Sequence, residues 1–332
     1  MAPGDNSILP SPPSDDITQI SFGLGSNSHL LSASSWDGCV HIYNTNNITF
    51  LTKFDLMVPA LTNSFISEDR ILTTGSDCEV SLYNIQSATN EKIGATKRPC
   101  ITSHYNLQNN LVMTGSLDRT LYQWDPRAPN TPLKELVHQE SISSMDSINN
   151  KLVVATYQRY ITLWDLRQFK EPIETRESSL KFQTRTIKCF PNGHGYVVGS
   201  IEGRVALEPF DSTNQSVINR YAFKCHREKD SKEIIYPITA LAINKKYNTF
   251  ATGGSDGVVN IWDGFNRKRL VQLPNFPTTV CSMTFNYDDS KLAIASSYMY
   301  EQGPKENVAP PSITIRQVND TDIKPKHLVN SA

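Results

Sequence analysis

A short phrase that recurs along the chain constrains its fold more than any other feature. The clearest copy spans residues 252–263, where small residues lead to an Asp-Gly pair at Asp256 and Gly257 and then to alternating apolar residues that end in Trp-Asp. An Asp-Gly turn between two alternating segments predicts a β-hairpin. Further copies end in an aromatic or Trp-Asp anchor, and the anchors are Tyr43, Tyr83, Trp124, Trp164, Phe210 and Trp262.

The spacing of these anchors predicts the architecture. Successive anchors lie 40, 41, 40, 46 and 52 residues apart. A period of about 40–45 residues built of short strands is typical of the blades of a WD-repeat β-propeller. With a degenerate last copy at residues 295–297 and 312–316, the chain is predicted to be all-β, with seven blades of four strands each, called a to d here in chain order.

A propeller must close its ring, because an open edge strand invites aggregation. Residues 1–13 form a polar, proline-rich segment with a short apolar run before the prolines. We expect residues 6–9 to add the outer strand of the last blade, the alternative being a disordered tail. The propeller is then expected to span residues 14–318, followed by a flexible polar tail at residues 319–332.

Composition excludes several classes of function. The 332 residues carry a formal net charge of −1, so no global charge attracts the chain to nucleic acid or membranes. The sequence has no run of about 18 apolar residues and no apolar signal core at its N-terminus. Its six cysteines occur singly, as expected of buried thiols in a reducing compartment. These features predict a protein of the cytosol or nucleus.

The sequence offers a binding surface and not a reaction. Asp37, Asp77, Asp118 and Asp256 lie in predicted b–c turns, where aspartate accepts hydrogen bonds from its own turn backbone. The histidines are scattered without metal-ligand spacing, and no nucleophile elbow or phosphate-cradling glycine loop is present. We therefore expect no enzymatic activity, no metal and no cofactor.

The topology of a blade predicts which residues share a surface. Since antiparallel strands reverse direction, the b–c turns and d–a loops emerge at one face of the ring, called the b–c face below. Arg185, Arg204 and Lys224 should all reach this face at blade five, where cations suit a phosphate or an acidic motif. Ordinary solvated charge is the alternative. Trp36, in the first b–c turn, is either a core wedge or an exposed anchor for a partner.

Two loops depart from the repeat. A long charged segment at residues 226–235 approaches blade six, and a proline-rich insertion at residues 300–311 separates strands b and c of blade seven. Both are predicted to add loop structure to the b–c face.

Several phrases resemble those of a known family. They lie at residues 176–185, 200–206, 221–227, 251–263 and 292–301. Through them the chain resembles the mitotic-checkpoint WD-repeat proteins of the "budding uninhibited by benzimidazole" (Bub) group. The resemblance implies a non-catalytic nuclear scaffold of the spindle-assembly checkpoint, monomeric on its own and located at kinetochores in mitosis. The implied partners are the GLEBS motifs of a Bub-type kinase and a Mad-type checkpoint protein, and phosphorylated MELT repeats of the kinetochore scaffold.

The resemblance also implies roles for individual residues. By position, Trp36 and Arg185 correspond to the GLEBS-binding surface, and Arg204 and Lys224 to the phosphothreonine site. The family often has tryptophan in the third b–c turn, where this chain has Leu117. The GLEBS contact at that turn is therefore expected to be weaker or differently shaped.

Two alternatives remain open at this point. The sister family, the messenger-RNA export propeller of the nuclear pore, also reads GLEBS motifs. Separately, the sequences at residues 124–127 and 164–167 are similar to the WDxR boxes of substrate receptors of cullin ubiquitin ligases. Binding to phosphorylated MELT peptide would distinguish the checkpoint family from the first, and loss of a cullin adaptor on Arg127→Ala would favour the second.

Overall fold

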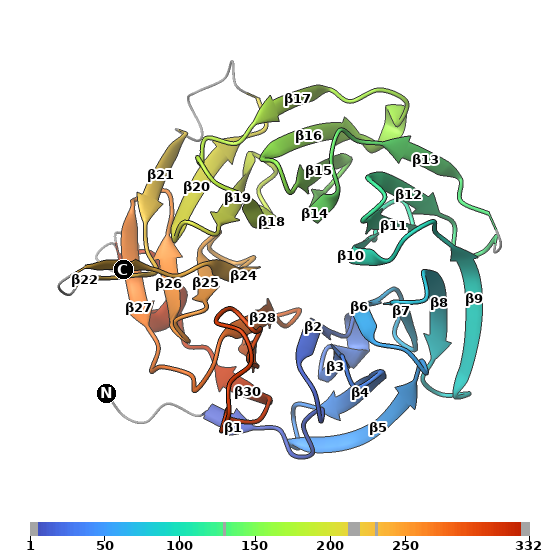
Figure 1. The fold of residues 1–332 in the computed structure, drawn as a ribbon, viewed down its shortest axis with the longest axis horizontal. Coiled ribbons are helices and arrows are strands. Elements are labelled where there is room, and N and C mark those ends of the chain that lie inside the picture. Colours follow the sequence, from blue (N-terminus) through green and yellow to red (C-terminus); the bar gives the residue numbers. More distant parts are fainter. Residues whose placement is uncertain (1–5, 129–130, 212–219, 230–231, 327–332) are drawn as a thin grey trace.

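The computed structural model describes residues 6–128, 131–211, 220–229 and 232–326. Within this part of the chain, seven four-stranded antiparallel sheets stand in a ring, and one two-stranded hairpin lies beside them (Figure 1). The predicted all-β, seven-bladed propeller is confirmed. No helix in the described ranges is long and apolar enough to cross a membrane.

The bounds of the elements follow the four-strand repeat. The strands of blades one to three are β2 (Ile17–Phe22), β3 (Leu30–Ser35), β4 (Cys39–Asn44), β5 (Thr49–Asp55), β6 (Ala60–Phe65), β7 (Arg70–Gly75), β8 (Glu79–Asn84), β9 (Thr89–Ala95), β10 (Cys100–Asn106), β11 (Leu111–Ser116), β12 (Thr120–Trp124) and β13 (Lys134–Val137). Those of blades four to six are β14 (Ile142–Ile148), β15 (Lys151–Thr156), β16 (Tyr160–Asp165), β17 (Glu174–Glu177), β18 (Thr184–Cys189), β19 (Gly195–Ser200), β20 (Arg204–Pro209), β21 (Tyr221–Lys224), β24 (Ile238–Ile243), β25 (Phe250–Gly254), β26 (Val259–Asp263) and β27 (Lys268–Gln272). Blade seven comprises β28 (Val280–Phe285), β29 (Lys291–Ser296), β30 (Ser312–Gln317) and β1 (Asn6–Ile8), while short 3₁₀ turns occur at η1 (Gly25–Asn27) and η2 (Leu166–Gln168).

The b–c hairpins explain the recurring phrase. In blade six, Gly257 has a φ of +72°, and a Cβ there would lie 2.4 Å from the Phe276 carbonyl oxygen. Glycine is therefore required at this turn, since it alone tolerates both the positive φ and the close approach. In blades two and three, Cys78 and Arg119 adopt the same left-handed conformation, with φ of 70° and 73°. The turn geometry thus recurs where its glycine does not, because the rest of the hairpin holds it.

The hydrophobic core is divided among the junctions between blades. Seven buried clusters are present among the described residues, and each joins side chains of two neighbouring blades. Between blades one and two, for example, Val40 and Ile42 meet Phe65 and Ile71, all at most 2% exposed. A single blade buries one face only through its neighbours, so the ring is stable only when it is complete.

The N-terminal strand closes the ring. β1 pairs antiparallel with β30, with Ser7 opposite Ile315, and thereby supplies the outer strand of blade seven (Figure 1). The next residue, Leu9, donates its backbone N–H to Ile313 at 2.9 Å and is 1% exposed in the cluster between blades seven and one. The closure by an N-terminal strand is as predicted, and the disordered-tail alternative is excluded for residues 6–9.

Two segments differ from the expectation. Residues 319–332 were predicted to be a flexible tail, but α1 (Asp320–Ile323) packs against blade six, with Ile323 3% exposed in its core cluster. The Thr249 hydroxyl donates to the Ile323 carbonyl at 3.0 Å, which fixes this turn. One apolar residue in a polar segment was too weak a signal to predict the docking, and residues 327–332 lie outside the described part. The charged segment before blade six forms the hairpin of β22 (Arg227–Lys229) and β23 (Glu233–Ile235).

Candidate functional site

Blade five aligns the predicted basic residues at one end of its sheet. Thr184 of β18 pairs with Ser200 of β19, Ser200 pairs with Arg204 of β20, and Arg204 pairs with Lys224 of β21. Arg185 follows Thr184 and so lies at the same end of the inner strand. All three cations therefore occupy the b–c end of blade five. Arg204 and Lys224 are direct cross-strand neighbours, whereas Arg185 lies at the channel.

Two of the residues assigned to the GLEBS surface line the central channel. Trp36 and Arg185 both line a central cavity of about 1040 Å³. The Trp36 residue is 51% exposed, and its backbone N–H donates to the Asp16 carbonyl at 3.0 Å. This exposure is incompatible with a core wedge. Leu117, in contrast, is half-buried and is not among the described residues that line the cavity.

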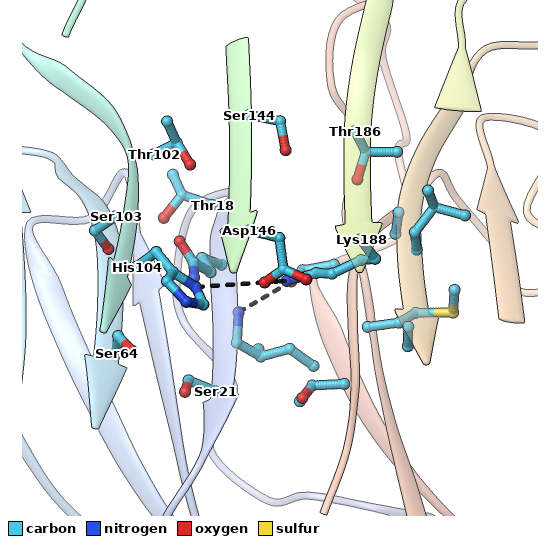
Figure 2. Close-up of a pocket in the computed structure, with 18 of the residues that line it drawn as sticks. Thr18, Ser21, Ser64, Thr102, Ser103, His104, Ser144, Asp146, Thr186 and Lys188 are labelled. Atoms are coloured by element: carbon cyan, nitrogen blue, oxygen red, sulfur yellow. Dashed lines mark hydrogen bonds and ion pairs between the residues drawn. The ribbon is translucent and has the colours of Figure 1, made fainter. Parts of the chain in front are cut away.

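Inside the channel lies a cluster of three ionisable side chains, one from each of three inner strands. The sequence did not predict this cluster. Figure 2 shows His104 of β10, Asp146 of β14 and Lys188 of β18 facing one another among serine and threonine side chains. The Asp146 carboxylate lies 3.3 Å from His104 Nδ1 and 3.6 Å from Lys188 Nζ. Burial lowers the pKa of His104; Asp146 opposes this shift and Lys188 adds to it. The only sequence signal was the alternation that turns these positions of strand a inward.

Each of the four turn aspartates accepts the same kind of hydrogen bond. Each carboxylate accepts the backbone N–H of the residue two positions later, which holds the tight b–c turn. The bonds join Asp37 to Cys39 at 2.9 Å, Asp77 to Glu79 at 3.1 Å, Asp118 to Thr120 at 2.8 Å and Asp256 to Val258 at 3.1 Å.

Blade six extends this bond into a buried network. His226 Nδ1 lies 2.9 Å from the Asp256 carboxylate, and His226 Nε2 lies 2.8 Å from the Thr252 hydroxyl. The Trp262 indole N–H donates to the same hydroxyl at 3.0 Å. The network ties the turn to strands b and c and to the loop after strand d. Asp256 is thus engaged in structure.

In blade one, Asp37 of the b–c turn and Cys39 and His41 of β4 place their side-chain donor atoms within 4.8 Å of one another. The spacing of these residues in the sequence did not predict this grouping. Asp37 Oδ2 lies 3.1 Å from His41 Nε2 and accepts the Ser14 backbone N–H at 3.0 Å. Burial acts to raise the pKa of Asp37, but hydrogen bonds from His41, Cys39 and Ser14 outweigh it and hold the pKa well below its ordinary value. Because its oxygens are already engaged, the carboxylate serves the turn.

The arginines of the two WDxR sequences lie at the opposite face. Arg127 and Arg167 follow strand c, and each forms a two-point ion pair with the aspartate two positions before it. Their side chains remain 69% and 70% exposed. The pairing fixes each guanidinium against its own loop, a local role that needs no partner.

The chain matches a known repeat family and a solved structure of the same fold. The "WD domain, G-beta repeat" family matches residues 7–44 and 221–263. The solved structure of U3-55K superposes with a TM-score of 0.82 over 95% of this chain and 98% of that one, at 14% identity, and so shares the fold. Together with the seven described sheets, these matches define a WD-repeat β-propeller protein.

Sequence relatives define the family more narrowly. The chain is 39% identical to mitotic checkpoint protein bub-3 of Caenorhabditis elegans, covering 96% of this chain and 95% of the relative. It is 38% identical to mitotic checkpoint protein BUB3.1 of Arabidopsis thaliana, covering 98% and 96%. The poly(A)+ RNA export protein of Schizosaccharomyces pombe is 32% identical, covering 95% and 91%. The chain belongs to the Bub3 family of mitotic checkpoint WD-repeat proteins.

Proposed function

We propose that this chain is a non-catalytic scaffold of the spindle-assembly checkpoint, which binds GLEBS motifs and phosphorylated MELT repeats on its b–c face. It then acts in the nucleus and at kinetochores in mitosis, with a Bub-type kinase and a Mad-type protein as partners. The observation that carries the proposal is the convergence on this face of an exposed tryptophan at the channel mouth and a pair of cations on the outer strands of blade five.

The channel mouth supports the peptide part of the proposal. Trp36 offers a large, exposed indole at the rim of the cavity that Arg185 also lines. Exposed aromatic and arginine side chains are typical of the few residues that dominate binding energy at protein interfaces. A peptide with apolar and acidic side chains fits this pair. Leu117 lies away from the cavity, so we expect the third b–c turn to contribute less.

Arg204 and Lys224 support the phosphate part. They stand opposite each other in the β20–β21 pair, with side chains 36% and 49% exposed. A phosphothreonine carries about −1.5 to −2 charges and three acceptor oxygens. Arg204 can bond two of these oxygens through its guanidinium fork, while Lys224 acts as a point charge. Each charge-assisted bond is worth about 1.5–3 kcal/mol.

Calorimetry with phosphorylated and unphosphorylated MELT peptides tests the proposal, with a GLEBS peptide bound to the protein. The wild type is expected to prefer the phosphorylated form. Arg204→Ala and Lys224→Ala should each weaken its binding about tenfold to a hundredfold. Arg127→Ala, on the opposite face, is the matched control. The proposal fails if the wild type shows no preference, or if both variants keep it.

The relatives in messenger-RNA export leave a second function to test. The mRNA export factor GLE2 of Chaetomium thermophilum is 31% identical over 96% of this chain. A GLEBS pull-down does not separate the two functions, since both families are expected to bind that motif. A preference for phosphorylated MELT peptide, or location at unattached kinetochores, favours the checkpoint function.

A further inference from the structure

An internal carboxylate already pairs with Lys224, one of the two cations of the proposed phosphate site. Glu233, at the start of β23, places one carboxylate oxygen 3.1 Å from Lys224 Nζ and 3.1 Å from Arg227 Nη1. Hydrogen bonds from Lys224 and Arg227 lower the pKa of Glu233, so this carboxylate is ionised at neutral pH. The β22–β23 hairpin, which the sequence predicted as a charged loop, therefore places the Glu233 carboxylate at the proposed phosphate site.

The Arg227 side chain is largely buried and is bonded to the backbone of the b–c turn of blade five. Its side chain is 10% exposed, and its Nη2 donates to the Glu202 carbonyl at 2.6 Å. The carboxylate of Glu202 in turn lies 3.6 Å from Arg204 Nε. Within the described residues, the buried Nε atoms of Arg204 and Arg227 have no hydrogen-bond partner. Arg204, Lys224 and Arg227 thus form one group of cations, called the blade-five cation cluster below.

We propose that Arg227 is a third cation of the phosphate site, and that Glu233 is an internal competitor which an incoming phosphothreonine displaces. The inference rests on the proposed function, because it assigns new residues to the same site. A phosphate brings more charge and more acceptor oxygens than a carboxylate. Exposed ion pairs such as that of Glu233 with Lys224 are weak, so the exchange is feasible.

The competitor has a consequence for selectivity. A ligand must displace Glu233 before it gains binding energy from Lys224 and Arg227. A dianionic phosphate meets this requirement, whereas an unmodified threonine offers no charge to replace the carboxylate. Glu233 therefore weakens binding of phosphorylated peptide and suppresses binding of peptides that carry a single negative charge.

The hairpin offers a matched control for removing this charge. Glu228 lies in β22, is exposed, and accepts a hydrogen bond from the Tyr236 hydroxyl at 3.1 Å. Glu228→Gln and Glu233→Gln change the net charge of the protein equally and on the same hairpin. Only the second removes a contact with the cation cluster, so any difference between them reports that contact.

The experiment is calorimetry of phosphorylated MELT peptide against the GLEBS-bound wild type, Glu233→Gln and Glu228→Gln. Glu233→Gln is expected to tighten binding about three- to tenfold, because the phosphate no longer displaces a carboxylate. Glu228→Gln should change it less than about twofold. Arg227→Gln should weaken it about tenfold, with circular dichroism checking the fold. The Glu233→Gln comparison decides the matter even where Arg227→Gln does not fold.

The outcomes separate this inference from the function beneath it. If the wild type prefers phosphorylated peptide but Glu233→Gln binds no tighter than Glu228→Gln, the competitor role is overturned and the proposed function stands. If folded Arg227→Gln binds as the wild type does, Arg227 is not part of the site. A wild type without phosphate preference overturns the proposed function, and this inference with it.

Discussion

Trp36 and Asp37 are neighbours in one b–c turn, and the fold uses them in opposite ways. The Asp37 carboxylate accepts backbone N–H groups from Ser14 and Cys39 and holds the turn closed. The Trp36 indole stands at the rim of the channel, and the residue is 51% exposed. Because the aspartate and the backbone stabilise the turn, the tryptophan is free to serve a partner.

Replacing Trp36 tests that division. Trp36→Ala should weaken GLEBS-peptide binding by about 2 kcal/mol or more, since a central aromatic anchor loses its contact area. Calorimetry gives the loss, and circular dichroism with thermal melting should show an intact fold. Leu107→Ala is the control, because Leu107 is 66% exposed in an a–b loop of the opposite face. A folded Trp36→Ala protein with unchanged affinity would contradict the anchor role.

Asp16 beside the channel mouth predicts a dependence of stability on pH. Burial raises its pKa to about 6, with further contributions from the charges of Asp15 and Glu301. A carboxyl with a raised pKa binds its proton more tightly in the folded state, so its contribution to stability is present at low pH and is lost as pH rises to about 6. Asp16→Asn should therefore raise the melting temperature at pH 7 more than at pH 4. Equal shifts at both values in thermal melts would contradict this origin.

At the scale of the element, closure and surface are built by segments that lie outside the regular repeat. β1 comes from the opposite end of the chain to its partner β30, and α1 follows the last blade to cover the core of blade six. The β22–β23 hairpin interrupts the path from blade five to blade six and brings Glu233 to Lys224. β1, α1, β22 and β23 each have only three or four residues.

Removing the closing strand should destabilise the whole ring. Deletion of residues 1–9 exposes the edge of β30 and removes Leu9 from its cluster, and loss of a buried leucine alone costs about 2–5 kcal/mol. A lower midpoint in urea unfolding is the expected result. Deletion of residues 1–5, which leaves β1 and Leu9 in place, is the control and should unfold as the full chain does. Equal midpoints for the two deletions would show that β1 does not stabilise the ring.

At the scale of the whole molecule, similar blades build a ring whose b–c face is not uniform. The interblade clusters are similar around the ring, but only one face gathers Trp36, Arg185 and the blade-five cation cluster. The net charge of −1 provides no general attraction for an anion. Under the proposed function, recognition of phosphate must therefore be local, and the two ligands are expected at separate places on one surface.

Separate places predict separable losses of binding. Arg204→Ala and Lys224→Ala should leave GLEBS binding within about twofold of the wild type, because substitutions at sites without shared partners act independently. Trp36→Ala, in contrast, should weaken binding of the GLEBS peptide. Calorimetry of the GLEBS peptide against each variant makes the comparison. Parallel losses for both ligands in every variant would indicate a single shared site.

Most of the architecture could be predicted from local sequence signals. The Asp256-Gly257 turn, the alternation on either side of it and the 40-residue spacing of the anchors each depend on a few adjacent residues. Such signals are present in the chain before it folds, so the seven blades, the closing strand and the ends of strands that hold Arg204 and Lys224 were predictable. Family phrases added the expected roles of these residues, which local chemistry does not define.

Only the tertiary structure decided which groups face each other across long separations. His104, Asp146 and Lys188 come from three different blades, and their ion pairs exist only when the ring is closed. Glu233 meets Lys224 because a hairpin folds back on blade five, and Ile323 is buried because blade six leaves a place for it. Neighbours in sequence determined the turns and strands, whereas these contacts required the register of whole blades, since burial and electrostatic pairing depend on distance in space.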